Sequence, residues 1–163
     1  MTTQWRFLPC GDCRHKGFYN CDNAERALNK IAYTDYFDAE PNEEFPYGTA
    51  DSLLRGSCQL FALSLSKMFG YQAYVIECIY TKRFHAFCRV SKNGQLYYID
   101  ARGVTTSFDE FMEVASFFVP SDYNIREITS TDLEAWNRDE EYLLEAFAFA
   151  EAVIKDYEES YRI

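Results

Sequence analysis

Three side chains in the middle of the chain are of the types that carry out nucleophilic catalysis. They are Cys58 in RGSCQLFALSLSKMFG, His85 in FHAFCRV and Asp100 in YYIDARG. In such a set the thiolate attacks a carbonyl carbon, the imidazole takes up and returns the proton, and the carboxylate orients the imidazole. The residue types therefore predict acyl-transfer chemistry, provided that the fold brings the three side chains together.

The cysteine stands at the start of a predicted helix. Gly56 ends the short helical segment before it, Ser57 is a helix-capping residue type, and the apolar residues of 58–69 recur at helical spacing up to Gly70. A helix N-terminus has partial positive charge and free N–H groups, which favour a thiolate and can bind an oxyanion. The alternative is a buried Cys58 that fills the core, because cysteine is among the most buried residue types.

The histidine and the aspartate lie on two predicted neighbouring strands. Segments 72–80, 84–91 and 95–101 have strand composition, and Asn93-Gly94 between the last two is a strong signal for a β-hairpin. Mirror pairing about that turn sets the histidine opposite roughly residue 101 or 102, so a shift of one residue brings the aspartate alongside it. The alternatives are a hydrogen-bonded core histidine and an aspartate that only ends its strand.

Elements on both sides of this region complete the expected fold. Capping boxes formed by Asp22 with Glu25 and by Thr131 with Glu134 open two further helices. The additional elements are helices over 23–37, 50–55, 108–116 and 131–160 and extended segments over 117–120 and 123–129. This order indicates an α+β fold, with an antiparallel β-sheet packed against helices. With 48% hydrophobic residues, the chain is expected to form a single domain over 1–163.

The order of cysteine, histidine and aspartate on a helix, a strand and its hairpin partner resembles the core of the papain-like superfamily. The nearest branches are the transglutaminase-like proteins and the small bacterial peptidase-like proteins, and the resemblance covers about residues 55–112. It implies that Cys58 is the nucleophile, His85 the general base and acid, and Asp100 the residue that orients His85. It also implies a papain-like or transglutaminase-like fold for this catalytic-like core.

The resemblance leaves the reaction open. Resolution of an acyl-enzyme by water would make the protein a peptidase, amidase or deamidase, and resolution by an amine would make it a transferase. Its substrate would be a peptide, a protein or another amide. Ser57, Gln59 and Arg102 are the candidates for substrate binding, and Gln59 stands where the family usually has tryptophan. Arg102 would hold a carboxylate; alternatively it forms a structural ion pair.

The N-terminal segment, 1–21, is expected to be irregular and contains the motif CGDCRHKGFYNC. Its thiols and imidazole are the candidates for a structural zinc site, and no other cofactor is expected. The alternative is a set of free or partly buried thiols. The four candidate ligands are Cys10, Cys13, His15 and Cys21. Cys78 and Cys88 lie on predicted strands and are expected in the core.

The net charge of −10 argues against direct, sequence-independent binding to nucleic acid, which needs clustered cations. The acid concentrates in 37–45 and in the C-terminal acidic helix predicted over 131–160, where solvated faces are the ordinary interpretation. The second function hypothesis is a catalytically silent binding or inhibitor protein on the same scaffold, encoded by a phage or mobile element, whose acidic helices dock on a basic protein.

Neither a membrane span nor a signal peptide is indicated by the sequence. No stretch reaches the length of uncharged apolar residues that a span needs, and the first residues lack the basic-then-apolar plan of a signal peptide. The expected location is therefore the cytoplasm of a bacterial or phage-infected cell, without membrane association.

Overall fold

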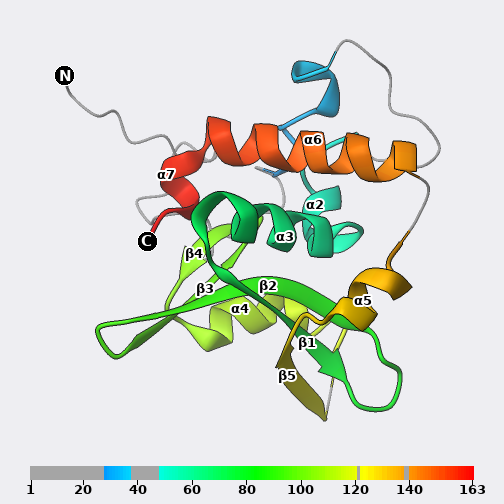
Figure 1. Cartoon of the computed structure of the whole chain (residues 1–163). Coiled ribbons are helices and arrows are strands. Elements are labelled where there is room, and N and C mark those ends of the chain that lie inside the picture. The colour runs from blue at the N-terminus through cyan, green and yellow to red at the C-terminus, as the bar shows by residue number, and fades with distance from the viewer. Residues whose placement is uncertain (1–27, 38–47, 121, 138–139) are drawn as a thin grey trace.

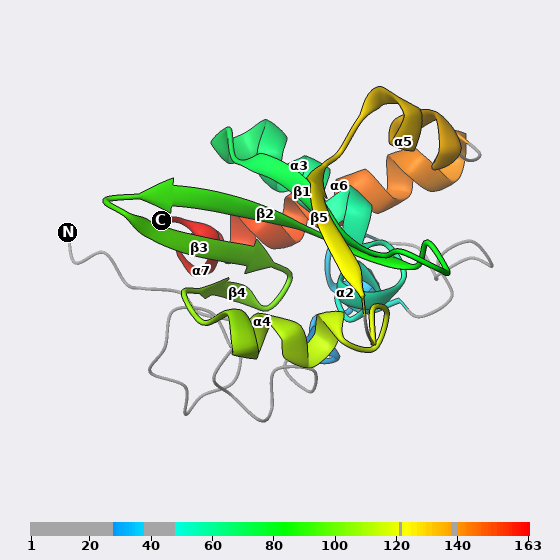
Figure 2. The same ribbon diagram turned by 90° about the horizontal axis from the view of Figure 1, so that it is seen from below.

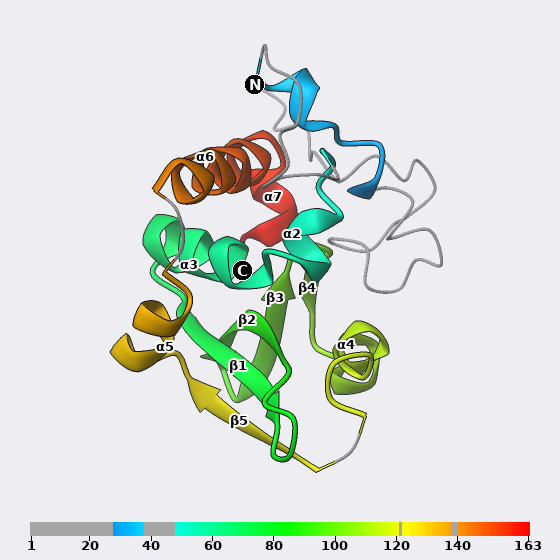
Figure 3. The same cartoon turned by 90° about the vertical axis from the view of Figure 1, so that its right-hand side faces the viewer.

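The computed structural model describes residues 28–37, 48–120, 122–137 and 140–163, and all structural statements below concern these residues. Its fold is mixed α+β, as the sequence predicts, with one five-stranded antiparallel sheet and helices on both faces. Helices α3 (Cys58–Phe69) and α6 (Glu140–Asp156) lie in successive layers over one face of the sheet (Figure 1). Helix α4 (Phe108–Ala115) covers the other face (Figure 3).

The sheet has the strand order β4-β3-β2-β1-β5, with every neighbouring pair antiparallel (Figure 2). The strands are β1 (Gln72–Cys78), β2 (Phe84–Lys92), β3 (Gln95–Asp100), β4 (Gly103–Thr105) and β5 (Tyr123–Glu127). The predicted strands β1, β2, β3 and β5 are confirmed. Strand β4 was not predicted, because three residues after a sharp turn give no periodic pattern.

Local sequence signals fix the two elements that carry the central residues. Gly70 ends α3 in the left-handed conformation, with φ +77°, which glycine adopts without steric cost. Asn93 and Gly94 have φ values of +52° and +78°, as a two-residue turn between twisted strands requires. The predicted start and end of α3 and the predicted β2–β3 hairpin are therefore confirmed.

Apolar side chains form a separate core on each face of the sheet. Between the sheet, α3 and α6, the core includes fully buried Leu65 and Phe149. Beneath α4, the core is built on Phe87 and Phe111, whose ring centroids are 4.6 Å apart. Successive residues of β2 point to opposite faces, so this strand contributes to both cores.

The C-terminal acidic helix predicted over 131–160 is wrong as a single element. It consists of α5 (Ser130–Ala135), α6 and α7 (Glu158–Tyr161). Thr129 and Asp132, rather than Thr131 and Glu134, form the capping box of α5. Helix α5 ends at Ala135, and the next residue, Trp136, stacks its ring on that of Phe84 with ring centroids 5.0 Å apart. This is a tertiary contact that helical periodicity does not encode.

Two other predicted elements differ in the structure. Of the helix predicted over 23–37, residues 31–37 form an isolated β-bridge at Ala32 and the 3₁₀ helix η1 (Tyr33–Asp35). The Asp35 carboxylate accepts a hydrogen bond from the Ala32 N–H at 3.1 Å and so closes this tighter turn. Residues 117–120 form turns rather than an extended segment. Helix α2 (Ser52–Arg55) and the Ser107-capped helix α4 are as predicted.

Candidate active site

Helix α3 brings the Cys58 thiol to the side of strand β2. Cys58 is the first residue of the helix, and its Sγ accepts a hydrogen bond from the backbone N–H of Ala86 at 3.4 Å. This N–H is available because the β2–β3 ladder begins only at the pair Cys88–Ile99. The sulfur therefore occupies a place along β2 that a paired strand would otherwise fill. Cys58 is only 6% exposed and belongs to the core between the sheet and α3, and it also lines a pocket.

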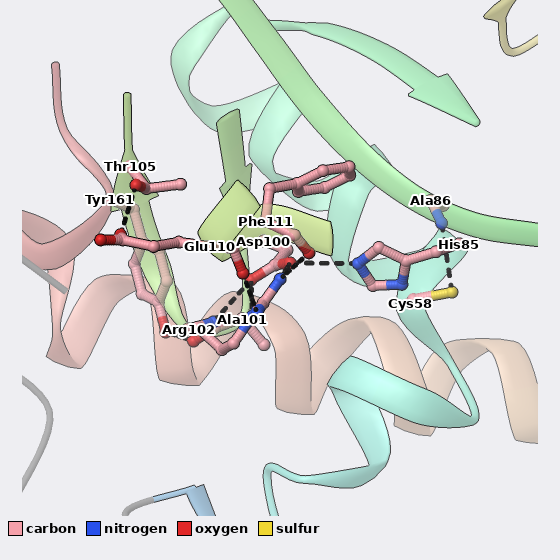
Figure 4. A network of polar contacts seen from close by, with 10 residues as sticks. All are labelled: Cys58, His85, Ala86, Asp100, Ala101, Arg102, Thr105, Glu110, Phe111 and Tyr161. Atoms are coloured by element: carbon pink, nitrogen blue, oxygen red, sulfur yellow. Dashed lines mark hydrogen bonds and ion pairs between the residues drawn. The ribbon is translucent and has the colours of Figure 1, made fainter. Parts of the chain in front are cut away.

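His85 links Cys58 to Asp100 across the start of β2. Its Nε2 lies 3.0 Å from Asp100 Oδ2, and its other ring nitrogen, Nδ1, is turned toward the Cys58 thiol (Figure 4). Nδ1 is buried and has no hydrogen-bond partner within the described part of the chain. The imidazole ring stacks on the ring of Phe118, with the ring centroids 6.0 Å apart and the ring planes 9° from parallel. The ring is thus fixed in one orientation between a thiol and a carboxylate.

Asp100 ends β3 and is held by Arg102. The Arg102 backbone N–H and Nε donate to Oδ1 at 2.9 Å and 3.1 Å, and Nη2 donates to Oδ2 at 2.7 Å. The Tyr161 hydroxyl donates to the carbonyl of Ala101 at 2.9 Å and so anchors the intervening turn. Arg102 therefore binds both oxygens of the Asp100 carboxylate, and Oδ2 also faces His85.

Burial and neighbouring charges determine the protonation states of Asp100 and His85. Burial raises the pKa of Asp100, but the Arg102 guanidinium and the bond from His85 outweigh this and hold the pKa well below its usual range. Burial lowers the pKa of His85, because a charged ring loses its hydration. The hydrogen bond and negative charge of Asp100, together with the neighbouring Cys58 side chain, outweigh that effect and raise the pKa of His85 to about 9. A protonated ring near neutral pH follows.

Arg102 does not take the place predicted for a substrate-binding residue. Its side chain is 2% exposed, and beyond Asp100 it donates to the backbone carbonyls of Glu110 and Phe111 at 3.2 Å and 3.1 Å. A guanidinium whose donors are bound to a buried carboxylate and two carbonyls is not presented to a ligand. The structural ion pair, which the sequence left open as the alternative, is the arrangement that the structure contains.

A pocket of about 460 Å³ opens in front of the thiol. Cys58 and Gln59 line its helical side, and Phe84, Phe118 and Trp136 form its aromatic walls. Its rim carries the cations Arg55, Lys82 and Arg83. The pocket gives the sulfur access from solvent, whereas His85 and Asp100 lie behind it and are buried.

Comparisons with known proteins give this chain no family. No protein-family model, no curated protein and no solved structure matches it.

The other predicted site residues divide between the pocket and the interior. Gln59 lines the pocket, and its Oε1 lies 3.8 Å from the Cys58 sulfur. Ser57 precedes the helix and is 4% exposed, so its side chain is nearly closed off from solvent. Cys78 and Cys88 are buried in the core, as predicted. Burial raises the pKa of the Cys88 thiol, so we expect that cysteine to react slowly as a nucleophile.

The predicted zinc ligands Cys10, Cys13, His15 and Cys21 lie outside the described residues, so the zinc site stays a prediction. Within the described ranges, no group of three or more His, Cys, Asp or Glu side chains is placed to hold a metal ion. None of the helices in those ranges combines the length and apolar character that a membrane crossing requires.

Sequence reasoning missed the residues that act on the site from a distance. Phe118 and Trp136 reach the pocket from segments far along the chain, and no pattern in their own segments marks them. The role of Arg102 had a local signal, since an aspartate and an arginine two residues apart on a tight turn can pair. The docking of the thiol on the Ala86 N–H had none, because it depends on where the β2–β3 ladder stops.

Proposed function

We propose that this protein is a thiol-dependent acyl hydrolase or acyl transferase with Cys58 as nucleophile, His85 as general base and acid, and Asp100 as orienting residue. One observation carries the proposal: a buried imidazole bonds a carboxylate through one nitrogen and turns the other toward a cysteine at a helix N-terminus. A purely structural histidine satisfies both ring nitrogens, since an unpaired buried polar atom costs roughly 1–3 kcal/mol.

The reaction begins with the proton shared by sulfur and ring. With the proton on His85, the Cys58 thiolate attacks the substrate carbonyl carbon, and an S–C bond forms while the carbonyl electrons move to oxygen. When the tetrahedral intermediate collapses, the bond to the leaving group breaks, and His85 donates its proton to that group. Water or an amine then attacks the thioester, His85 accepts its proton, and the thiolate leaves.

The start of α3 supplies donors for the oxyanion. The first N–H groups of a helix have no intrahelical acceptor, and those of Cys58 and Gln59 are the first two of α3. They lie next to the attacking sulfur, in the partial positive field of the helix N-terminus. One such donor contributes about 10²–10³ in rate in a preorganised site.

Asp100 keeps the ring in the productive tautomer. With Nε2–H bonded to its carboxylate, the atom that exchanges the proton with sulfur is Nδ1. Arg102 in turn keeps the carboxylate charged, so the imidazolium always has a counter-ion. The order Cys, His, Asp on α3, β2 and β3 supports assigning this core to the papain-like superfamily, in its transglutaminase-like or small peptidase-like branches.

Alkylation of the thiols by iodoacetamide near neutral pH tests the proposal. We expect Cys58 to be modified selectively over Cys78 and Cys88, with the modified residue identified by peptide mass spectrometry. In His85→Asn, the modification of Cys58 should slow by at least tenfold, because the thiolate loses its imidazolium partner. Circular dichroism checks that the variant is folded.

An activated ester then tests acyl transfer itself. Incubation with p-nitrophenyl acetate should release p-nitrophenol and leave an acetyl group on Cys58. In Cys58→Ser, both the rapid initial release of p-nitrophenol and the acetylation should be lost. A folded protein whose Cys58 is no more reactive than Cys88 toward either reagent would overturn the proposed enzyme.

A further inference from the structure

The mouth of the Cys58 pocket is positively charged although the chain as a whole carries a net charge of −10. Lys82 and Arg83, at the end of the β1–β2 hairpin, both line the pocket and are exposed. Arg55 lies on the rim at the end of α2, and its Nε is 3.9 Å from the carboxylate of Asp51. Three of the chain's 16 basic residues thus meet at one opening.

The two hairpin cations are not neutralised by neighbouring acids. Neither Lys82 nor Arg83 makes an ion pair within the described ranges of the chain. Arg83 instead lies with its guanidinium carbon 5.7 Å from the centroid of Phe118, a ring that walls the pocket. A cation stacked on a ring of the wall is held beside the pocket, and here its guanidinium forms no ion pair with a described residue.

Nearby carboxylates are committed to other partners. Glu77 and Asp132 are both bonded to Arg126, at 3.0 Å and 2.7 Å. Asp122, close to the same hairpin, accepts a hydrogen bond from the Tyr80 hydroxyl at 3.3 Å. Glu77 and Asp132 are therefore bound to Arg126 and Asp122 to a hydroxyl, so none of the three forms an ion pair with Lys82 or Arg83.

We infer that the pocket selects acyl substrates that carry a carboxylate beside the reacting carbonyl, with Lys82 and Arg83 as its binding residues. The inference rests on the proposed function, since it names the substrate class of the same thiol. A peptide substrate provides such a group as an aspartate or glutamate side chain or as its terminal carboxylate. In this class, the two cations bind the anion while the carbonyl lies over the Cys58 sulfur.

The inference also explains why a chain this acidic keeps cations at its candidate site. Like charges repel at range, so a uniformly acidic surface would disfavour the approach of an anionic substrate. Unpaired cations at the mouth make the local potential there less negative than elsewhere on the surface. The effect is short-ranged, because at about 0.1 M salt charges more than roughly 10 Å apart are largely screened.

Paired alkylating reagents separate this inference from the reactivity of the thiol itself. Iodoacetate and iodoacetamide form the same S–C bond with Cys58 and expel iodide, but only iodoacetate carries a carboxylate next to the reacting carbon. We measure the ratio of the two rates at Cys58 in the wild type and in Lys82→Asn with Arg83→Gln. Asparagine is chosen because residue 82 has φ +63°, which it tolerates.

The matched control removes two cations elsewhere. Lys67→Gln with Lys92→Gln changes the net charge equally, and Lys92 lies at the far end of β2, about 26 Å from Phe84 at 3.3 Å per residue. We expect the iodoacetate preference to fall about threefold to tenfold in the pocket variant and to stay unchanged in the control. The difference should shrink as salt is added.

The outcomes distinguish the two claims. Equal rate ratios in the wild type and the pocket variant, with Cys58 reactive in both, would overturn the selection for carboxylates and leave the nucleophile in place. A Cys58 inert to both reagents in the folded wild type would overturn the proposed function and this inference with it. A ratio that falls only in the pocket variant supports both.

Discussion

His85 and Asp100 are diagonal neighbours on one face of the sheet rather than a directly opposed pair. The β2–β3 register, with Cys88 opposite Ile99, extends to residue 102 opposite His85, so Asp100 is two residues away and on the same face. Their side chains meet across the open end of the ladder at 3.0 Å.

The first prediction concerns Asp100→Asn. The amide keeps the shape of the carboxylate but loses its charge, so the pKa of His85 should fall and the imidazolium should no longer be stable at neutral pH. We expect Cys58 alkylation at neutral pH to slow at least tenfold, because the charged fraction of His85 falls about tenfold for each unit by which its pKa drops below the pH of the assay. The pH profile of alkylation by iodoacetamide measures this.

A matched control guards against a general effect of charge. Asp109→Asn removes an exposed acid in the first turn of α4 and should leave the profile unchanged. A folded Asp100→Asn protein with the wild-type pH profile would remove Asp100 from the proposed mechanism.

The second prediction is a dependence of stability on pH. The pKa of His85 rises from 6.5 to about 9 on folding, so the ring contributes stability that is complete below pH 6.5 and is lost as pH rises through about 9. The size of this loss is about 3 kcal/mol. Asp100 behaves in the opposite sense: its lowered pKa adds stability above the ordinary value near 3.8 that is lost in acid.

Urea unfolding at pH 6 and at pH 9.5 measures the contribution of His85. The wild type should lose about 3 kcal/mol more between the two pH values than His85→Asn does, because the variant has no ring to titrate. Equal losses in the two proteins would mean that His85 is not charged in the folded state.

The sequence predicts those parts of the site that local patterns encode. Helix α3 begins at Cys58, where the helical apolar pattern starts after Gly56 and Ser57, although the Ser57 side chain makes no cap hydrogen bond. The Asn93-Gly94 turn sets the register of β2 and β3 to within a residue. Together these two features place thiol, imidazole and carboxylate in one region. The α+β class and the core positions of Cys78 and Cys88 follow from the same periodicity.

The remaining features depend on contacts between distant segments. The helix predicted over 131–160 breaks where Trp136 stacks on Phe84. The sequence pattern of this range does not predict a break at that position. Arginine is usually a surface residue, yet Arg102 is buried because Asp100 and two backbone carbonyls of α4 accept hydrogen bonds from its side chain. Whether a charge is buried is decided by the partners that the fold supplies.

The third prediction separates a structural Arg102 from a substrate-binding one. Arg102→Met keeps most of the side-chain volume but leaves the buried Asp100 carboxylate without its counter-ion, which should cost about 3–5 kcal/mol of stability. Arg102→Lys restores the charge without the two-pronged geometry and should lose less. Urea unfolding measures both variants. A Met variant as stable as the wild type would show that the pair contributes nothing.

The last prediction concerns the aromatic wall of the pocket. Trp136 closes the pocket on the side of α5 by stacking on Phe84, so Trp136→Ala should widen the approach to Cys58. We expect the rate of modification by the bulky reagent N-pyrenylmaleimide to rise relative to that by iodoacetamide, because only the larger reagent is obstructed. The control is Leu133→Ala, because Leu133 is an exposed residue of α5 that does not line the pocket. An unchanged ratio in a folded Trp136→Ala protein would mean that substrates reach the thiol from the hairpin side, past Lys82 and Arg83.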